Sequence, residues 1–420
     1  MKEKYYKRKL EDKINKFIKR REIIGIRGPR QTGKTTLLKI IEKKIKGDKA
    51  FINLDLIEYR RALEENPIDF VKRFKKAGKR LFLFLDEVQR VKECGEKLKI
   101  IFDEFLDVKT FISGSSSLEL KTNVLPPLVG RLLLFELLTF DFEEFLSTKD
   151  EGLKKLFKEK HNSLKNFFDG KGKIIQPSFT NEFLKYWKEY IIFGGYPEVV
   201  KAIDEEEKRT ILRNIFNLYL EKDIEAFFGI EETSKFEDLL KLLAFNISNL
   251  LSISSLSSDL KISIRKVNNF LTILQHSYII YFLRPFYKNL STEIKKSPKT
   301  YFLDLGLRNS VINNFSSFDS RSDKGELMEN FVLRELVSNF NDWKINFWRT
   351  TGKAEIDFIL TKDENIIPIE VKLSGEKLGK GFYSFLNIYK PKKAVIITLD
   401  KFKKKNINNT TIYWVPVFYF

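Results

Sequence analysis

The sequence predicts an α/β fold in three parts: an amino-terminal parallel sheet with helices on both faces, a central helical domain of winged-helix type, and a carboxy-terminal α/β domain. A glycine-bearing loop joins an apolar run to a helical pattern near residue 30, and apolar runs then alternate with helical patterns to about residue 147. A second set of strands with regularly placed acids fills the last third. At 420 residues, the chain is too long for one hydrophobic core.

The loop from Gly28 to Thr35 has the spacing G-x-x-x-x-G-K-T and lies between the apolar run at 23–26 and a helical pattern. Glycines let such a loop curl so that several backbone N–H groups point inward, and the helix N-terminus adds partial positive charge. Lys34 would reach the β- and γ-phosphates of ATP, and Thr35 would bind Mg²⁺. The alternative is an ordinary turn before a helix. The predicted nucleotide-binding residues are Gly28, Pro29, Arg30, Gln31, Thr32, Gly33, Lys34, Thr35 and Thr36.

Two acids follow a buried strand at 81–85. Ligands gather at the carboxyl ends of parallel strands, where Asp86 and Glu87 are expected to lie. Asp86 would complete the Mg²⁺ shell opposite Thr35, and Glu87 would orient or deprotonate the attacking water as a catalytic residue. Alternatively, the two acids cap the next helix.

Two further residues are candidates for catalysis. A strand at 109–113 ends in a serine cluster, from which Ser115 or Ser116 would hydrogen-bond the γ-phosphate or the water; serines also serve as plain helix caps. Arg131, before a strand at 132–137, would stabilise charge on a neighbouring subunit's γ-phosphate, which requires a homo-oligomer. It is equally placed to form a surface salt bridge.

These motifs together resemble those of a known protein family. Residues 20 to about 147 resemble an AAA-type P-loop ATPase, and their order resembles that of a large uncharacterised prokaryotic family in which such a module precedes a domain with a restriction-endonuclease-like core. The resemblance implies ATP and Mg²⁺ as cofactors, a sensor-like serine near Ser115, and a trans-acting Arg131. The segments that carry it are Gly28–Thr36, Leu85–Gln89, Gly114–Ser117, Gly130–Arg131 and Phe142–Leu146.

The middle of the chain predicts helices around an irregular segment. Residues 148–190 are lysine-rich and hold glycine and proline breakers, which indicates an insertion or flexible loop. A long helix is expected at 204–228. Three helical patterns and a strand within 236–283 have the outline of a winged helix, whose last helix presents Arg265 and Lys266. This helix would read DNA or pack as an ATPase lid.

The last part predicts a strand at 300–306, a loop to residue 322, a helix, and three strands between 345 and 372. Glu329, Asp357 and Glu370 would surround one hard cation, and Lys372, on the face of Glu370, would assist a water without binding the metal. This order resembles the PD-(D/E)xK nuclease core. The alternative is an ion pair between Glu370 and Lys372 in an inactive fold. Glu355, on the same strand face as Asp357, is a further candidate that would support the metal ligands.

The predicted domains are therefore residues 1–147 for the ATPase, 148–232 for an insertion and helical lid, 233–290 for the winged helix, and 291–420 for the nuclease-like domain.

The amino-acid composition indicates which binding partners and metal ligands to expect. The formal charge of +19 favours a polyanion such as DNA, although lysine enrichment also follows from a hot or AT-rich source. One cysteine and two histidines leave oxygen as the ligand type for metals. No apolar run reaches the roughly 18 residues that a membrane helix needs, so we expect no membrane partner and a cytoplasmic location.

Two functions fit these observations. The first is an Mg-ATP-dependent AAA-type ATPase that acts on DNA, with a nuclease-like domain of open activity. The second is a nucleotide-gated binding or remodelling protein with a protein partner and an inactive carboxy-terminal fold.

Overall fold

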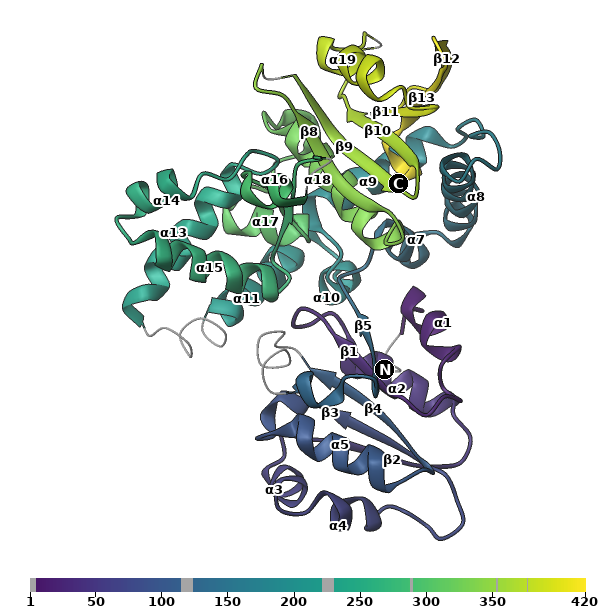
Figure 1. Cartoon of the computed structure of the whole chain (residues 1–420), viewed down its shortest axis with the longest axis vertical. Helices are drawn as coiled ribbons and strands as arrows, with labels where there is room; N and C mark the ends of the chain where they lie inside the picture. Colours follow the sequence, from purple (N-terminus) through teal and green to yellow (C-terminus); the bar gives the residue numbers. More distant parts are fainter. Residues whose placement is uncertain (1–4, 115–123, 221–229, 288–289, 353, 376) are drawn as a thin grey trace. The chain divides into compact units, whose positions relative to one another are not determined.

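The computed structural model describes residues 5–114, 124–220, 230–287, 290–352, 354–375 and 377–420 (Figure 1). It divides into two compact units. The first comprises residues 1–139 with 271–279, and the second comprises residues 140–270 with 280–420. Among the described residues, no helix has the length and apolar character required to cross a membrane.

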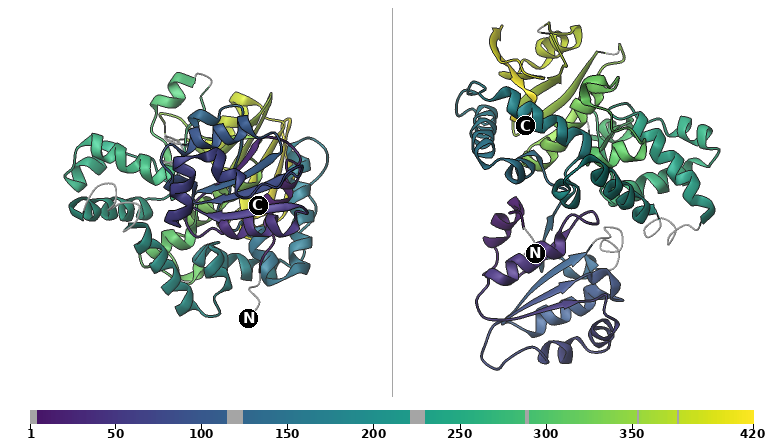
Figure 2. Two further views of the ribbon diagram at one scale, coloured as in Figure 1. Left: turned by 90° about the horizontal axis from the view of Figure 1, so that it is seen from below. Right: turned by 180° about the vertical axis from the view of Figure 1, so that it is seen from behind.

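The first unit is built on a five-stranded, all-parallel sheet in the order β2-β3-β4-β1-β5. This confirms the predicted parallel sheet. Its strands β1 and β3 are nearly continuous apolar runs, as expected where helices cover both faces of a sheet (Figure 2). The strands are β1 (Ile23–Arg27), β2 (Asp48–Asn53), β3 (Leu81–Asp86), β4 (Val108–Gly114) and β5 (Leu132–Glu136).

Each face of this sheet has its own hydrophobic core. Helices α1 (Lys9–Asn15) and α2 (Lys34–Lys44) bury Ile14, Leu38 and neighbouring apolar side chains on one face. Helices α3, α4 and α5 pack on the other. Their bounds are Ile57–Glu65, Pro67–Lys72 and Cys94–Glu104, and short 3-10 helices lie at Val88–Arg90 and Pro126–Leu128.

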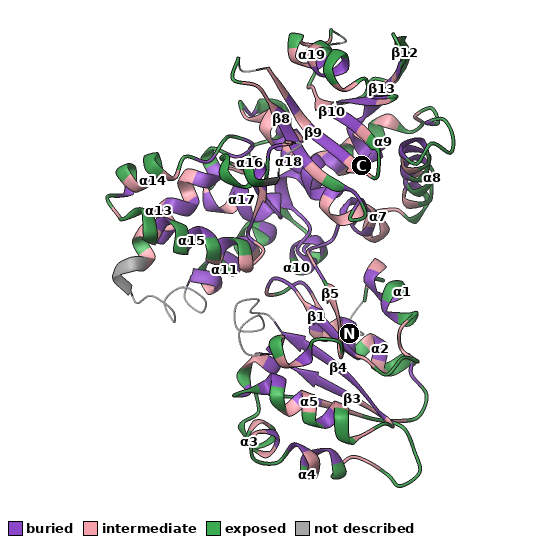
Figure 3. Ribbon diagram, in the orientation of Figure 1, coloured by how far each residue is buried: buried purple, intermediate pink, exposed green. Residues whose placement is uncertain are grey.

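The segment 148–190, predicted to be irregular, is largely helical. Leu153, Phe157, Leu164 and Phe167 recur at helical spacing and are buried, while exposed residues such as Lys155 and Lys158 alternate with them, so the helix has a buried and an exposed side (Figure 3). The predicted breakers fall between two helices rather than within one. The helices of this region are α7 (Phe142–Lys149), α8 (Glu151–Phe168), α9 (Thr180–Phe193), α10 (Pro197–Lys201) and α11 (Glu205–Tyr219).

The central helices follow the predicted order and lead into a small antiparallel sheet. These elements are α13 (Ile230–Phe245), α14 (Ile253–Leu260), α15 (Ile264–His276), β6 (Ile280–Leu283), α16 (Leu290–Lys295) and β7 (Lys299–Phe302). The strand predicted at 300–306 is shorter, and it pairs with β6 across the predicted domain boundary at 290/291. The winged-helix assignment remains a prediction.

The carboxy-terminal domain contains a six-stranded mixed sheet in the order β12-β13-β11-β10-β9-β8. Helix α19 (Lys380–Tyr389) packs Phe382 and Phe385 on one face. Helix α18 (Lys324–Asn339) contacts β7 and β10, and α17 (Leu305–Val311) lies where the sequence predicted a loop. The strands are β8 (Lys344–Arg349), β9 (Glu355–Lys362), β10 (Asn365–Val371), β11 (Lys393–Thr398), β12 (Lys403–Ile407) and β13 (Thr410–Pro416); further 3-10 helices lie at Phe318–Ser320 and Val417–Tyr419.

Candidate nucleotide-binding site and carboxylate cluster

The predicted phosphate loop joins the end of β1 to the start of α2, and its glycines are required by geometry. A Cβ atom on Gly28 would lie 2.1 Å from the carbonyl oxygen of Leu137, and the φ of Gly28 is +156°. Gly33 is the N-cap of α2 with φ +88°. Both backbone conformations disfavour any residue with a Cβ.

The side chain of Lys34 lies within the loop. Lys34 is 6% exposed, and its ammonium donates hydrogen bonds to the carbonyl oxygens of Gly28 (3.0 Å) and Pro29 (2.7 Å). Thr32 is fully buried and donates its hydroxyl to Pro29 at 2.9 Å. The loop is therefore already curled around the lysine. Of the remaining predicted residues, Arg30, Thr35 and Thr36 are half-buried and Gln31 is exposed with φ +60°.

Asp86, at the end of β3, accepts hydrogen bonds from two hydroxyl groups. Thr35 donates to Oδ2 at 2.7 Å, and Ser113 of β4 donates to Oδ1. Asp86 is 3% exposed. A carboxylate and a threonine hydroxyl side by side are hard oxygen donors, so these residues fit Mg²⁺. Sequence reasoning missed Ser113; its position in the strand next to the acid was the available signal.

Glu87 follows directly and has a left-handed backbone conformation, with φ +60° and ψ +42°. This conformation is uncommon for a non-glycine residue and is enriched at functional sites. Gln89 donates a hydrogen bond to Oε2 of Glu87. Glu87 thus follows Asp86 directly, at the N-cap of a 3-10 helix, and its role in positioning water stays a prediction.

Arg8 is a second residue that sequence reasoning missed. Its guanidinium is buried and donates to the carbonyl oxygens of Thr32 (2.8 Å) and Leu138 (2.7 Å). It therefore links the phosphate loop to the segment that follows β5. No sequence motif predicts this contact, because Arg8, Thr32 and Leu138 are far apart along the chain.

The two remaining catalytic candidates are Ser115 and Arg131. Ser115 lies outside the described residues. Arg131 forms two hydrogen bonds with Asp103, at 2.9 and 3.0 Å, and this contact lowers the pKa of Asp103. The carbonyl of Arg131 accepts from the N–H of Ile23, at the start of β1. Arg131 therefore lies beside the start of β1, whereas the phosphate loop follows the end of the same strand.

In the carboxy-terminal domain, Glu329, Asp357 and Glu370 gather as predicted, but around a lysine. Lys299 of β7 is 3% exposed and lies 3.0 Å from Oε1 of Glu329 and 2.5 Å from Oε1 of Glu355. We call these five residues the carboxylate cluster. Tyr301 donates to Glu329 at 2.6 Å, and Arg349 contacts Glu355 at 3.0 Å.

Burial raises the pKa of all three predicted carboxyls to about 7. Their mutual repulsion adds to this: Asp357 raises the pKa of Glu329, Glu370 raises that of Asp357, and Glu329 raises that of Glu370. Burial alone would lower the pKa of Lys299, yet Glu329, Asp357 and Glu355 together raise it. The cluster thus keeps its lysine charged.

The predicted metal does not fit this arrangement. Within the described part of the chain, no three Asp, Glu, His or Cys side chains are placed so that they could hold a metal ion. Asp357 Oδ2 accepts from the N–H of Val371 at 2.7 Å. Lys372 Nζ is 4.0 Å from Glu370 and donates to the carbonyl of Lys377 at 2.7 Å. The ion pair that was the alternative for Glu370 and Lys372 is therefore present, though long.

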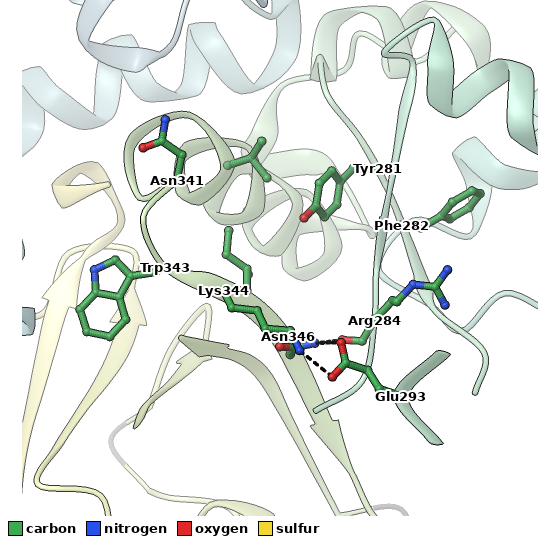
Figure 4. A pocket seen from close by; sticks show the side chains of 10 residues that line it. Tyr281, Phe282, Arg284, Glu293, Asn341, Trp343, Lys344 and Asn346 are labelled. Atoms are coloured by element: carbon green, nitrogen blue, oxygen red, sulfur yellow. Dashed lines mark hydrogen bonds and ion pairs between the residues drawn. The ribbon is translucent and has the colours of Figure 1, made fainter. Parts of the chain in front are cut away.

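A separate cavity of about 430 Å³ opens between β6, α16, α18 and β8 (Figure 4). Glu293, at its wall, is bound by Lys344 (2.7 Å) and by the side-chain amide of Asn346 (3.2 Å). Arg284 donates to the carbonyl of Ile294. The charged groups of this cavity are therefore engaged with the protein itself.

Comparison with known families identifies the first part of the chain. Residues 20–146 match the AAA domain family, and residues 184–317 and 324–417 match two domains of unknown function, DUF8612 and DUF4143. The chain therefore contains an AAA-type P-loop ATPase domain, as predicted. The nuclease-type assignment of the last domain stays a prediction.

Two curated relatives and one solved structure are similar to large parts of this chain. Uncharacterized protein MJ1544 of Methanocaldococcus jannaschii is 29% identical over 346 residues, covering 80% of this chain and 71% of the relative. An uncharacterized protein of Haemophilus influenzae is 22% identical over 426 residues, covering 98% and 96%. The Walker-type ATPase PABY2304 of Pyrococcus abyssi has a TM-score of 0.47 and 14% identity, covering 73% and 96%.

Proposed function

We propose that this chain, which carries an AAA-type P-loop ATPase domain at residues 20–146, binds Mg-ATP at the amino-terminal sheet and hydrolyses it. The observation that carries the proposal is Asp86, which accepts from both Thr35 and Ser113 beside a loop curled around Lys34. Hydroxyl, carboxylate and ammonium groups from three separate elements meet at one sheet edge.

Each residue has a role that follows from its position. Thr35 and Asp86 would hold the Mg²⁺, which when bound neutralises phosphate charge. Lys34 exchanges its hydrogen bonds with loop carbonyls for bonds to the phosphate oxygens. Glu87 orients the attacking water and accepts its proton, while Ser113 keeps the Asp86 carboxylate in place.

ATP turnover and nucleotide binding, measured side by side, test this proposal. Lys34→Ala should lose both. Glu87→Gln should keep nucleotide binding and lower kcat at least a hundredfold, because the isosteric amide cannot take the proton. Lys39→Ala, on an exposed position of the same helix, is the control and should behave as wild type. Unchanged turnover in Glu87→Gln would remove Glu87 from the reaction.

DNA is the proposed partner. Its support is the excess of 76 basic over 57 acidic residues and a basic pair on α15, where Arg265 is exposed and Lys266 half-buried. A DNA duplex titrated between 50 and 300 mM salt should lose affinity steeply, and replacing Arg265 and Lys266 by Ala should reduce the slope by about one per lost phosphate contact. Absence of binding at low salt would favour a protein partner.

One observation favours the second candidate function, in which the carboxy-terminal domain does not cut. Lys299 is paired with Glu329, one of the carboxylates that a nuclease would use for its metal, and with the neighbouring Glu355. DNA recovered after incubation with the protein, Mg²⁺ and ATP should therefore be intact. Nicks that disappear in Asp357→Ala, with ATP turnover retained, would instead support the nuclease.

A further inference from the structure

We infer that Lys299 is the resident cation of the carboxylate cluster, and that it and a divalent metal exclude one another there. The ammonium pairs with Glu329 of α18 and Glu355 of β9, and it interacts electrostatically with Asp357 of β9 and Glu370 of β10. The inference concerns the carboxy-terminal domain alone and is independent of ATP hydrolysis.

The contacts of Lys299 are those of a buried counter-ion. Its side chain is 3% exposed, and its ammonium lies within 3.0 Å of both Glu329 and Glu355. A buried ammonium is tolerated only where opposite charge surrounds it, and the surrounding acids supply that charge. A divalent ion bound to the same carboxylates would lie next to a positive charge that has no route to water.

The position of Lys299 is set by the backbone of a strand. Lys299 begins β7 and pairs with Leu283 of β6, and it also bridges to Leu250. Tyr301, two residues further along β7, points to the same face and donates to the same Glu329 oxygen at 2.6 Å. The strand therefore delivers two donors to Glu329, and the burial of the Lys299 side chain holds its ammonium among the carboxylates.

The direct test is Mn²⁺ binding by the nucleotide-free full-length protein, followed by electron paramagnetic resonance. Lys299→Met keeps the length of the side chain and removes its charge. Without the ammonium, the carboxylates that now surround it can draw together on a metal, so this variant should bind one Mn²⁺ more than wild type, at least tenfold tighter than any wild-type site in this domain. Adding Asp357→Asn to Lys299→Met should abolish the extra site.

Lys208→Met is the matched control. Lys208 is also buried, at 8% side-chain exposure, and is paired with Glu189 at 2.7 Å, but that carboxylate has a second partner in Lys149. This variant should gain no Mn²⁺ site. Equal Mn²⁺ binding by wild type and Lys299→Met would overturn the inference.

Thermal unfolding gives a readout that survives poor folding of the variant. Without nucleotide, Mn²⁺ should leave the Tm of wild type unchanged. It should raise the Tm of Lys299→Met, because the metal then replaces the missing charge. A wild-type Tm that rises with Mn²⁺, and no longer does so in Asp357→Asn, would show that the metal and Lys299 share the cluster and would refute mutual exclusion.

Discussion

At the scale of single residues, the nucleotide site depends on how Asp86 is held. Its two carboxylate oxygens accept from different hydroxyls, Thr35 on one side and Ser113 on the other. The aspartate is therefore fixed in one orientation by the protein's own hydroxyl groups. Such pre-organisation is worth more than the hydrogen bond itself, because a misplaced carboxylate misplaces the metal shell.

Ser113→Ala should lower ATP turnover about tenfold to a hundredfold. A hydrogen bond to a charged group contributes roughly 1.5–3 kcal/mol, and its loss leaves Oδ1 of Asp86 buried without this donor. Steady-state kinetics check the expectation, with Thr110→Val on the same strand as control. A wild-type kcat in Ser113→Ala would show that Thr35 alone suffices.

The raised pKa values of Glu329, Asp357 and Glu370, each about 7, make stability depend on pH. The folded protein holds these protons more tightly than the unfolded chain, whose carboxyls titrate near about 4. Their stabilising contribution is therefore complete below about pH 4 and is lost as the pH rises through about 7.

Asp357→Asn should accordingly flatten the decline of Tm between about pH 5 and pH 8, because the amide carries no proton to lose. Calorimetry at intervals of one pH unit measures this slope. Asp363→Asn, in an exposed turn of the same domain, is the control. If both variants follow the wild-type slope, the carboxylate cluster does not govern the pH dependence.

At the scale of elements, glycines fix how two helices cross in the second unit. A Cβ on Gly306 of α17 would lie 2.0 Å from the carbonyl oxygen of Phe193, the last residue of α9. The opposite case is Gly325 of α18, whose Cβ would meet nothing within 4 Å. Both glycines lie in helices, so replacing either by Ala changes helix propensity in the same direction. The difference in stability between the two variants therefore reports the packing around Gly306.

Gly306→Ala should lower the free energy of unfolding by about 1–3 kcal/mol, since the backbones must separate to admit the methyl group. Gly325→Ala should leave it unchanged or raise it by up to about 1 kcal/mol. Urea unfolding of both variants measures these changes in the free energy of unfolding. Equal effects would mean that the close approach of α9 and α17 relaxes without cost.

Elements with continuous apolar runs were predictable from sequence, and those with mixed patterns were not. The strand that ends at Asp86 is apolar throughout, so both it and its terminal acids were located correctly. Helix α8 was missed because lysines interrupt its apolar spacing. Lys299 was missed because its carboxylate partners are 30 and 56 residues away along the chain, where no local pattern connects them.

At the scale of the whole molecule, Arg131 bears on assembly. It lies at the sheet edge away from its own phosphate loop, so any action on ATP requires a second copy of the chain. In its own subunit, the exposed pair with Asp103 contributes little to stability. The residue is thus available to a neighbour at small cost.

ATP turnover per subunit should rise with protein concentration in wild type. At the highest concentration, Arg131→Ala should lower the rate at least tenfold. Kinetics across a dilution series measure this, with light scattering to follow assembly. Arg21→Ala is the control, because Arg21 stacks on Phe102 beside Arg131. A rate independent of concentration would assign Arg131 to the salt bridge alone.

The buried guanidinium of Arg8 has a practical consequence. It fastens Thr32 of the phosphate loop to Leu138 beyond the last strand, from a position well before the recognisable motif. A shortened protein that starts at β1 would keep every motif residue and yet lose this fastening. We expect such a protein to bind ATP poorly. The nucleotide site would then depend on a residue that precedes the phosphate-loop motif.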